Sequence, residues 1–415
     1  MRKLTEPAGA WAELVRMWSG ILLLLPMAGI ANSVPEAIST YVIRPSEDLQ
    51  SVVVEAQFAT GVDSLEARTG DVRKFEELAG CKGETVEVRG KKILTNSIQG
   101  CLRYRYPLIQ RSDRRSPPVR DGVVVSEPSD WLWAPKLDES DKIHIELSLP
   151  TAMEASVPWR ELGPGRFELV RSPGSSTGSV IFGQFSAHEI EIADARIRVA
   201  LIDGPGASLD REKTLRWLRT AGSEVARVGG KFPNPDLQVI VQPVAGHGRS
   251  AVPFGYVIRD GGEAVRFFVD PTRPLEDYLG DWTAIHEFSH LLLPYVRSRE
   301  KWISEGFASY YQNVLMARRG EYSESEAWNR LHRSFEQARK VRSPPRLDQL
   351  HRRPFWEVRI LIYWSGAAMA LLADTRLRTL SEGRESLDTV LGRLQECCLP
   401  SGSTWRAEEL FEKLD

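Results

Sequence analysis

The chain has 415 residues, of which 42% are hydrophobic and 27% are charged, and its formal net charge is −2. This composition is ordinary for a globular protein of two domains. Acidic and basic residues are well mixed, which argues against the basic surface of a nucleic-acid-binding protein, and we expect no nucleic-acid partner.

The first 33 residues have the pattern of an export signal. Arg2, Lys3 and Arg16 precede an apolar stretch from Trp18 to Ile30, and small residues follow it. The stretch is short for a membrane span. We therefore predict a signal peptide over residues 1–33 and an exported protein, periplasmic or secreted, without stable membrane insertion after cleavage. An uncleaved anchor is the alternative.

Residues 34–204 are predicted to form an N-terminal β-domain. Short segments rich in apolar and β-branched residues are separated by Gly, Pro, Asp and Ser, and Ile143–Leu147 alternates apolar and polar residues. Short strands at this spacing predict an antiparallel β-sandwich. The predicted strands include Ser51–Ala56, Thr85–Arg89, Gly122–Ser126, Lys142–Leu149, Gly165–Val170, Ser179–Phe182 and Arg196–Leu201.

The four cysteines fall into two pairs. Cys81 and Cys101 could close a hairpin-sized loop, and the sequence leaves open whether they are bridged. Cys397 and Cys398 are adjacent, and a bridge between neighbours would be strained. We therefore predict that this second pair consists of free thiols.

The pattern changes after Asp203, where Gly204–Gly206 is predicted to link two domains. In the second domain, residues 205–415, a few strands are followed by a chain that is almost entirely helical after Asp281. A small sheet followed by helices predicts an α+β class. The predicted elements are a helix at Asp210–Val228, strands at Leu237–Val241, Phe254–Arg259 and Ala264–Val269, and helices at Ser323–Val341, Trp356–Thr379, Ser386–Glu396 and Trp405–Leu414.

The string HEFSH, residues 286–290, lies on a predicted helix that begins at Asp281 and ends before Pro294. Residues four apart lie on one face of a helix, so the imidazoles of His286 and His290 can bind one ion. Glu287 would lie beside that ion, where it can take a proton from metal-bound water. The alternative is a helix whose two histidines belong to a hydrogen-bonded core.

A second helix is predicted from Ser304 to Gly320, with Glu305 in its first turn. Two antiparallel helices joined by a short loop can present three ligands to one point. A carboxylate beside two imidazoles leaves the fourth tetrahedral position of zinc open for water or substrate. The sequence therefore predicts one Zn²⁺ per chain, bound by His286, His290 and Glu305.

Four strings, HEFSH, WISEGFASYY, YWSGAAMALLADTRLR and SLDTVL, closely resemble the glycyl-aminopeptidase-like zinc metallopeptidases of the gluzincin clan. The resemblance is clearest from about Phe254 to the C-terminus. It implies a thermolysin-like, mostly helical zinc-peptidase domain over residues 205–415. The segment between His290 and Glu305 is shorter than in most of the family, which bears on substrate preference. The family's C-terminal PDZ domain is expected to be absent.

The resemblance also assigns roles to single residues. His286, His290 and Glu305 would be the zinc ligands and Glu287 the general base. Tyr363 matches the position from which these enzymes present a phenol to the tetrahedral intermediate, although it could also be a core aromatic.

Some gluzincin aminopeptidases hold the substrate's amino terminus with a glutamate that lies upstream of the first histidine. Glu263 is the nearest match, but the string around it does not reproduce theirs. We therefore predict that Glu263 is an ordinary carboxylate of a β-hairpin.

These features predict a zinc metallopeptidase that hydrolyses peptide bonds with metal-activated water and Glu287 as general base. An aminopeptidase acting on peptide or protein substrates is the first hypothesis. The alternatives are an endopeptidase of the same fold, an exported zinc-stabilised binding protein without catalysis, and a zinc hydrolase that acts on a non-peptide bond.

Overall fold

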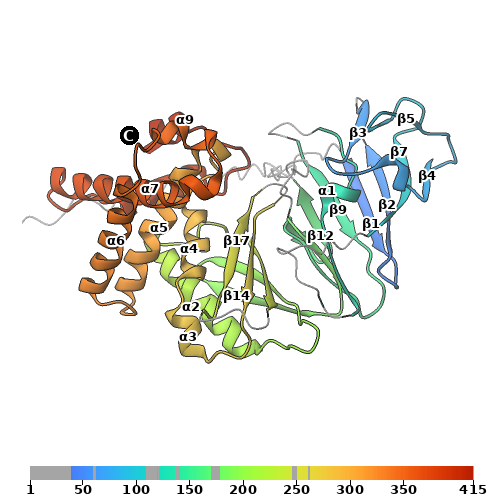
Figure 1. Cartoon of the computed structure of the whole chain (residues 1–415). Helices are drawn as coiled ribbons and strands as arrows, with labels where there is room; N and C mark the ends of the chain where they lie inside the picture. Colours follow the sequence, from blue (N-terminus) through green and yellow to red (C-terminus); the bar gives the residue numbers. More distant parts are fainter. Residues whose placement is uncertain are drawn as a thin grey trace, which may run out of the picture. The chain divides into compact units, whose positions relative to one another are not determined.

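The computed structural model describes residues 39–414 except 59–61, 109–118, 120, 137–140, 170–177, 245–249 and 260–261. The predicted signal peptide therefore lies outside the described residues. Strands dominate the first half of the described chain and helices the second half, drawn in blue and green and in orange and red (Figure 1). The predicted α+β class is confirmed.

The strands of the N-terminal half are β1 (Ser39–Pro45), β2 (Ser51–Phe58), β3 (Ser64–Glu66), β4 (Glu77–Gly80), β5 (Glu87–Arg89), β6 (Lys92–Leu94), β7 (Cys101–Pro107), β8 (Val123–Ser126), β9 (Ile143–Leu147), β10 (Glu154–Ser156), β11 (Arg160–Gly163), β12 (Arg166–Leu169) and β13 (Val180–Gly183). Each strand predicted by its residue range in this half is present with bounds within a few residues, and β1, β3, β4, β6, β7, β10 and β11 are additional.

These strands form one seven-stranded sheet, in the order β11-β12-β9-β1-β2-β7-β4, and two three-stranded sheets. One core joins the three sheets, and the buried Trp131, Trp133 and Trp159 belong to it. The pairing of β1 with β9 is parallel. The large sheet is therefore mixed, whereas the sequence predicts a purely antiparallel one, because a pairing between strands so distant in the chain leaves no local pattern.

Both cysteine pairs are bridged. The bond between Cys81 and Cys101 lies where β4 pairs with the start of β7. Cys397 and Cys398 are also joined, with their Cα atoms 3.7 Å apart. The prediction of free thiols at this second pair is wrong: the two residues end a helix, and the backbone there brings the sulfur atoms into bonding range.

A five-stranded sheet follows, in the order β14-β15-β16-β18-β17. Its inner strands β16 and β18 are buried throughout, because helices cover one face and Val123 and Ile181 of the small β10-β13-β8 sheet pack against the other. β17 is an edge strand beside the helices (Figure 1). The strands are β14 (Ser186–Ile192), β15 (Ala195–Leu201), β16 (Gln238–Pro243), β17 (Phe254–Ile258) and β18 (Ala264–Val269).

β14 and β15 were expected in the N-terminal domain, but β15 pairs in parallel with β16. The change from one set of sheets to the next therefore falls between Gly183 and Ser186. Because Ala37–Asp415 form one compact unit, the predicted domain boundary at residues 204 and 205 stays a prediction.

The helices of the described chain are α1 (Pro128–Trp131), α2 (Arg211–Gly229), α3 (Leu275–Gly280), α4 (Thr283–Ser289), α5 (Lys301–Arg318), α6 (Glu324–Arg339), α7 (Phe355–Leu380), α8 (Leu387–Cys398) and α9 (Ala407–Leu414). The predicted helices are present with bounds within a few residues, and α1 and α3 lie where no helix is predicted. The described residues also form the 3₁₀ turns η1 (Val72–Lys74), η2 (His290–Leu292), η3 (Ser298–Glu300) and η4 (Leu347–Arg352).

α5 and α7 cross at two glycines. A Cβ atom on Gly366 would overlap the carbonyl oxygen of Trp302, and one on Gly306 would overlap the backbone of Gly366. The two backbones can approach this closely only because neither residue has a side chain. The crossing places Glu305, next to Gly306, beside the turn of α7 that carries Tyr363.

Among the described helices, α7 is the one long and apolar enough to cross a membrane by length and composition. No later segment of spanning length was expected from the sequence. One face of α7 is buried in the fold, including Ala367, Ala370 and the charged Asp374. Met369, Leu372 and Leu380 of the same helix are exposed.

Candidate metal centre and active site

The HEFSH string begins on α4, and bonds at both ends of the helix hold it in place. Asp281 lies just before the helix, and its Oδ1 accepts the Thr283 N–H at 2.8 Å, in agreement with the predicted start. At the other end, the guanidinium of Arg259 donates to the carbonyl oxygens of His290 and Leu293. These bonds satisfy backbone groups that the helix itself leaves without partners.

The structure brings together the three residues predicted to bind metal. The Nε2 atoms of His286 and His290 lie 3.4 and 3.6 Å from Glu305 Oε2. One ligand atom from each residue lies within 4.8 Å of the others. α5 begins at Lys301, three residues earlier than predicted, because η3 runs directly into it. Glu305 is therefore in the second turn of α5, not the first.

Two residues of α5 contact the Nδ1 atoms of the imidazoles, the ring nitrogens that do not face Glu305. His286 Nδ1 lies 2.8 Å from Gln312 Oε1, and His290 Nδ1 lies 2.8 Å from Ser304 Oγ. An amide oxygen only accepts, so Nδ1 of His286 is the donor and its Nε2 is left as a metal-binding atom. Two imidazoles oriented in this way beside a buried carboxylate suit zinc.

Neither Gln312 nor Ser304 was predicted. Gln312 follows Glu305 by two helical turns, so both side chains lie on one face of α5. That spacing is the one signal that could have pointed to it.

Burial and the charges of neighbouring side chains together set the pKa values at the centre. Burial raises the pKa of Glu287 to about 7, with a further contribution from Glu305 and opposition from His286. Burial also lowers the pKa of His290 to about 3, so this imidazole is neutral, as metal binding requires. For Glu305, burial is outweighed by His290 and His286, which hold its pKa below the usual range.

Tyr363 reaches the same cluster from α7. Its ring stacks on that of His286 with the centroids 6.0 Å apart. Burial, followed by the charges of Glu305 and Glu287, raises the pKa of the phenol, so it remains a neutral donor. The structure thus places Tyr363 against a predicted metal ligand as well as against the small core of η4 and α7.

Lys301 is a further member of the cluster that the sequence did not reveal. Its Nζ lies 3.0 Å from Glu305 Oε1, the oxygen that faces away from the imidazoles. The same Nζ sits 5.1 Å above the ring of Phe355, the first residue of α7.

Glu263 does not reach the cluster. Its Oε2 accepts a hydrogen bond from Asn234 Nδ2 at 2.5 Å, and its Oε1 lies 3.3 Å from the guanidinium of Arg259. This agrees with the prediction of a structural hairpin carboxylate.

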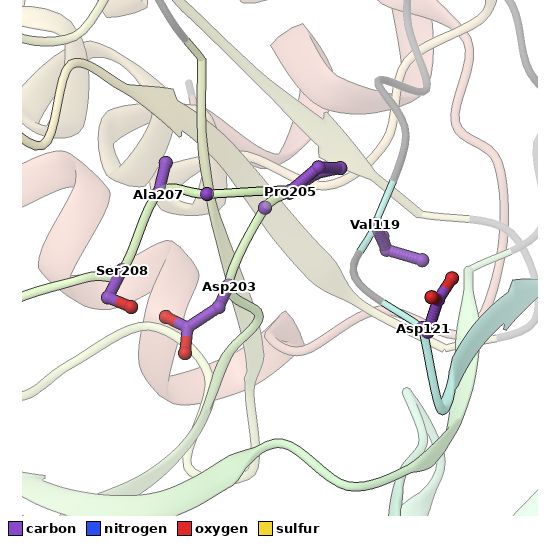
Figure 2. Close-up of a pocket in the computed structure, with 8 residues that line it drawn as sticks. Val119, Asp121, Asp203, Pro205, Ala207 and Ser208 are labelled. Carbon is purple, nitrogen blue, oxygen red and sulfur yellow. The ribbon is translucent and has the colours of Figure 1, made fainter.

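A cavity of about 380 Å³ lies apart from the metal cluster and shares no residue with it. Figure 2 shows Asp121 and Val119 on one segment and Asp203, Ala207 and Ser208 on another. The predicted linker Gly204–Gly206 forms part of its wall. One carboxylate oxygen of Asp203 accepts the Leu209 N–H, so this side chain holds the turn that precedes α2.

The family model described as M61 glycyl aminopeptidase matches residues 294–349, which include Glu305 and Gln312. No curated protein sequence matches the chain.

Similar solved structures extend over most of the chain. An aminopeptidase N family protein from Idiomarina loihiensis is 14% identical, with a TM-score of 0.64 over 90% of this chain and 72% of that one. The M1 zinc metallopeptidase from Deinococcus radiodurans is 15% identical, with a TM-score of 0.52 over 91% and 88%. Yeast LTA4 hydrolase in complex with bestatin is 12% identical, with a TM-score of 0.54 over 91% and 64%.

This chain has the gluzincin-type peptidase fold. The resemblance predicted from the four sequence strings is therefore confirmed. The Deinococcus protein is described as a zinc metallopeptidase, and the cluster of two histidines and a glutamate in this chain could hold a metal ion.

Proposed function

We propose that this protein is a zinc-dependent metallopeptidase in which His286, His290 and Glu305 hold one zinc ion. One observation carries the proposal: the three ligand atoms lie within 4.8 Å of one another, on imidazoles whose other nitrogens are already bonded. Peptides or proteins are the substrates that the similarity to peptidases supports.

The zinc ion, when bound, would acidify a water molecule and polarise the substrate carbonyl. Glu287, whose Oε2 lies 4.0 Å from His290 Nε2, can take the proton of the attacking water. Its pKa of about 7 lets it accept a proton near neutral pH and return it to the amine nitrogen as the C–N bond breaks. The neutral phenol of Tyr363 is the donor for the oxygen that gains negative charge.

Aminopeptidase activity is the finer proposal. It is supported by the description of the matched family model and by that of the Idiomarina protein. A mutant of the Deinococcus protein has been crystallised with the peptide Tyr-Ser-Ala as substrate.

One observation favours an endopeptidase as the second candidate. An exopeptidase of this kind needs an anion for the substrate's free amine, and Glu263 is held by Asn234 and Arg259 instead. Cleavage of matched peptides with free and acetylated amino termini separates the two. Loss of cleavage on acetylation supports the aminopeptidase, and equal cleavage supports the endopeptidase.

The test of the metallopeptidase proposal is the variant Glu287→Gln. The amide keeps the shape of the side chain but cannot take a proton, so kcat/KM on a peptide library should fall by about 10²–10⁴-fold. Zinc content, measured on the same sample, should stay at that of the wild type. Full activity together with full zinc content would disprove the role of Glu287. No turnover by the zinc-loaded wild type would favour the non-catalytic binding protein.

We also propose that the protein is exported to the periplasm or secreted. The bridge between Cys81 and Cys101 supports this, because such bonds persist in oxidising compartments.

A further inference from the structure

A basic and aromatic segment, residues 351–359, lies directly before Tyr363 in the sequence. It comprises the end of η4 and the start of α7. It contains three arginines, Arg352, Arg353 and Arg359, and one glutamate, in a chain whose net charge is −2. All three arginines are exposed, and none forms an ion pair with another residue of the described chain.

Two aromatic side chains of the same segment face solvent. Phe355 is 44% exposed and Trp356 is 78% exposed. Most of the Trp356 indole is exposed to water, so this side chain contributes little to the stability of the fold. Arginine and exposed aromatic side chains are the types enriched where proteins bind other chains.

The segment is continuous with the proposed active site. Leu350 and Val358 belong to a small buried cluster that also contacts Trp302 and Tyr363. Lys301 connects the two regions, because its Nζ contacts both Glu305 and the ring of Phe355. Arg359 lies one helical turn before Tyr363 on α7.

We propose that residues 351–359, together with Lys301, bind an acidic stretch of the polypeptide substrate beside the bond that is cleaved. This inference rests on the proposed peptidase function and names its substrate class.

The geometry of α7 sets the distance between the acidic stretch and the cleaved bond. With a rise of about 1.5 Å per residue, Arg359 and Phe355 lie roughly 6 and 12 Å from Tyr363 along the helix axis. An extended peptide spans about 3.3 Å per residue. The acidic side chains should therefore lie about two to four residues from the cleaved bond. This nearness to Tyr363 is why we assign the surface to substrate and not to an anionic membrane.

The experiment compares two internally quenched peptides that differ only at these positions, one with Asp and Glu and the other with Asn and Gln. The zinc-loaded full chain should cleave the acidic peptide with a kcat/KM about tenfold higher. The preference should fall as salt is raised from about 0.1 M to 1 M, because the Debye length shortens from about 10 to 3 Å.

The variant Arg352→Glu/Arg353→Glu should abolish or reverse this ratio. Arg376→Glu is the matched control, since Arg376 is an exposed arginine at the far end of the same helix. The control should keep the wild-type ratio. An equal kcat/KM for the two peptides in the wild type, or an unchanged ratio in the double variant, would overturn the proposal.

A binding measurement separates this inference from the proposed function. Zinc-loaded Glu287→Gln protein is titrated with the labelled acidic and neutral peptides and followed by fluorescence anisotropy. Tighter binding of the acidic peptide that is lost in the double variant supports the surface even if no wild-type turnover is found. Turnover without any charge preference overturns the surface and leaves the peptidase proposal standing.

Binding of the wild type and the double variant to anionic phosphatidylglycerol vesicles and to neutral phosphatidylcholine vesicles is measured as well. If the arginines are needed for binding to the anionic vesicles while neither peptide is preferred, the surface recognises a membrane and the proposal is wrong.

Discussion

The imidazoles of His286 and His290 are each oriented by a neutral side chain of α5. Gln312 holds the first and Ser304 the second, both at 2.8 Å. Because these bonds fix which nitrogen faces Glu305, they would contribute to the affinity for the proposed zinc ion without touching it.

We therefore expect Gln312→Ala to weaken zinc binding by about 10–100-fold, since the ring of His286 can then rotate and change tautomer. Competition with a chromophoric chelator measures the affinity. Gln337→Ala, an exposed glutamine of α6, is the control and should bind zinc like the wild type. Equal affinities in both variants would show that Gln312 does not orient the ring.

Asp374 joins three elements through one carboxylate. Its oxygens accept hydrogen bonds from Tyr310 Oη at 2.8 Å, Arg378 Nε at 3.0 Å and the Leu387 N–H at 2.7 Å. Burial raises its pKa, but these bonds outweigh burial and hold the pKa below the usual value. A carboxylate with a lowered pKa in the folded state stabilises the fold above its unfolded pKa of about 4 and loses that effect as the pH falls through the folded pKa.

The variant Asp374→Asn should therefore lower the free energy of unfolding by about 1–3 kcal/mol at neutral pH. As the pH falls from about 4 through the lowered pKa of the folded Asp374 carboxyl, the difference from the wild type should shrink, because the wild-type carboxylate then takes up a proton. Urea unfolding at several pH values measures both effects. A difference that stays constant down to pH 2 would contradict this reading.

At the scale of elements, the close crossing of α5 and α7 sets the relation between Glu305 and Tyr363. The two glycines at the contact leave no room for a methyl group. Gly366→Ala should push the helices apart and lower the free energy of unfolding by about 1–3 kcal/mol. It should also lower kcat more than it raises KM, because Tyr363 moves relative to the proposed ligands.

Gly280→Ala is the control for the added methyl group. Gly280 is exposed at the end of α3, and a Cβ there meets no atom within 4 Å. Urea unfolding should find the control close to the wild type. If Gly366→Ala is equally stable and active, the close approach has no role in positioning the two side chains.

Elements with a strong local period could be predicted from the sequence, and those that depend on distant partners could not. The apolar spacing and the capping residues placed α2, α6 and α8 within a few residues. The parallel pair of β1 and β9 joins strands far apart in the chain and leaves no such signal. The parallel pair of β15 and β16 is a strand–helix–strand unit around α2, which the predicted domain boundary divided.

Some residues of the candidate metal site could also be predicted from the sequence, and others could not. His286, His290 and Glu305 follow a spacing that metal chemistry demands, and the structure brings all three together. Lys301, Ser304 and Gln312 depend on how α4 and α5 pack, and residue type alone did not reveal them. The adjacent cysteines also went against expectation, since the local backbone at the end of α8 decides whether they meet.

For the whole molecule, the two disulfide bonds should contribute very differently to stability. The bond between Cys81 and Cys101 closes a loop of 20 residues, whereas Cys397 and Cys398 are neighbours. Closing the longer loop removes conformational entropy from the unfolded chain and should contribute about 3 kcal/mol.

The double variant Cys81→Ser/Cys101→Ser should therefore have a lower melting temperature, and Cys397→Ser/Cys398→Ser, the matched control, should change it little. Thermal unfolding followed by circular dichroism measures both. Equal effects of the two pairs would contradict the chain-entropy argument.

The central claim is that two imidazoles and the Glu305 carboxylate bind one zinc ion, and metal stoichiometry tests it most directly. Native mass spectrometry of the purified full chain should find one zinc per chain in the wild type and in Glu324→Gln, a control at an exposed carboxylate of α6. Glu305→Gln should bind zinc at least about tenfold more weakly. Undiminished zinc binding by Glu305→Gln, or a folded wild type that binds none, would contradict the account.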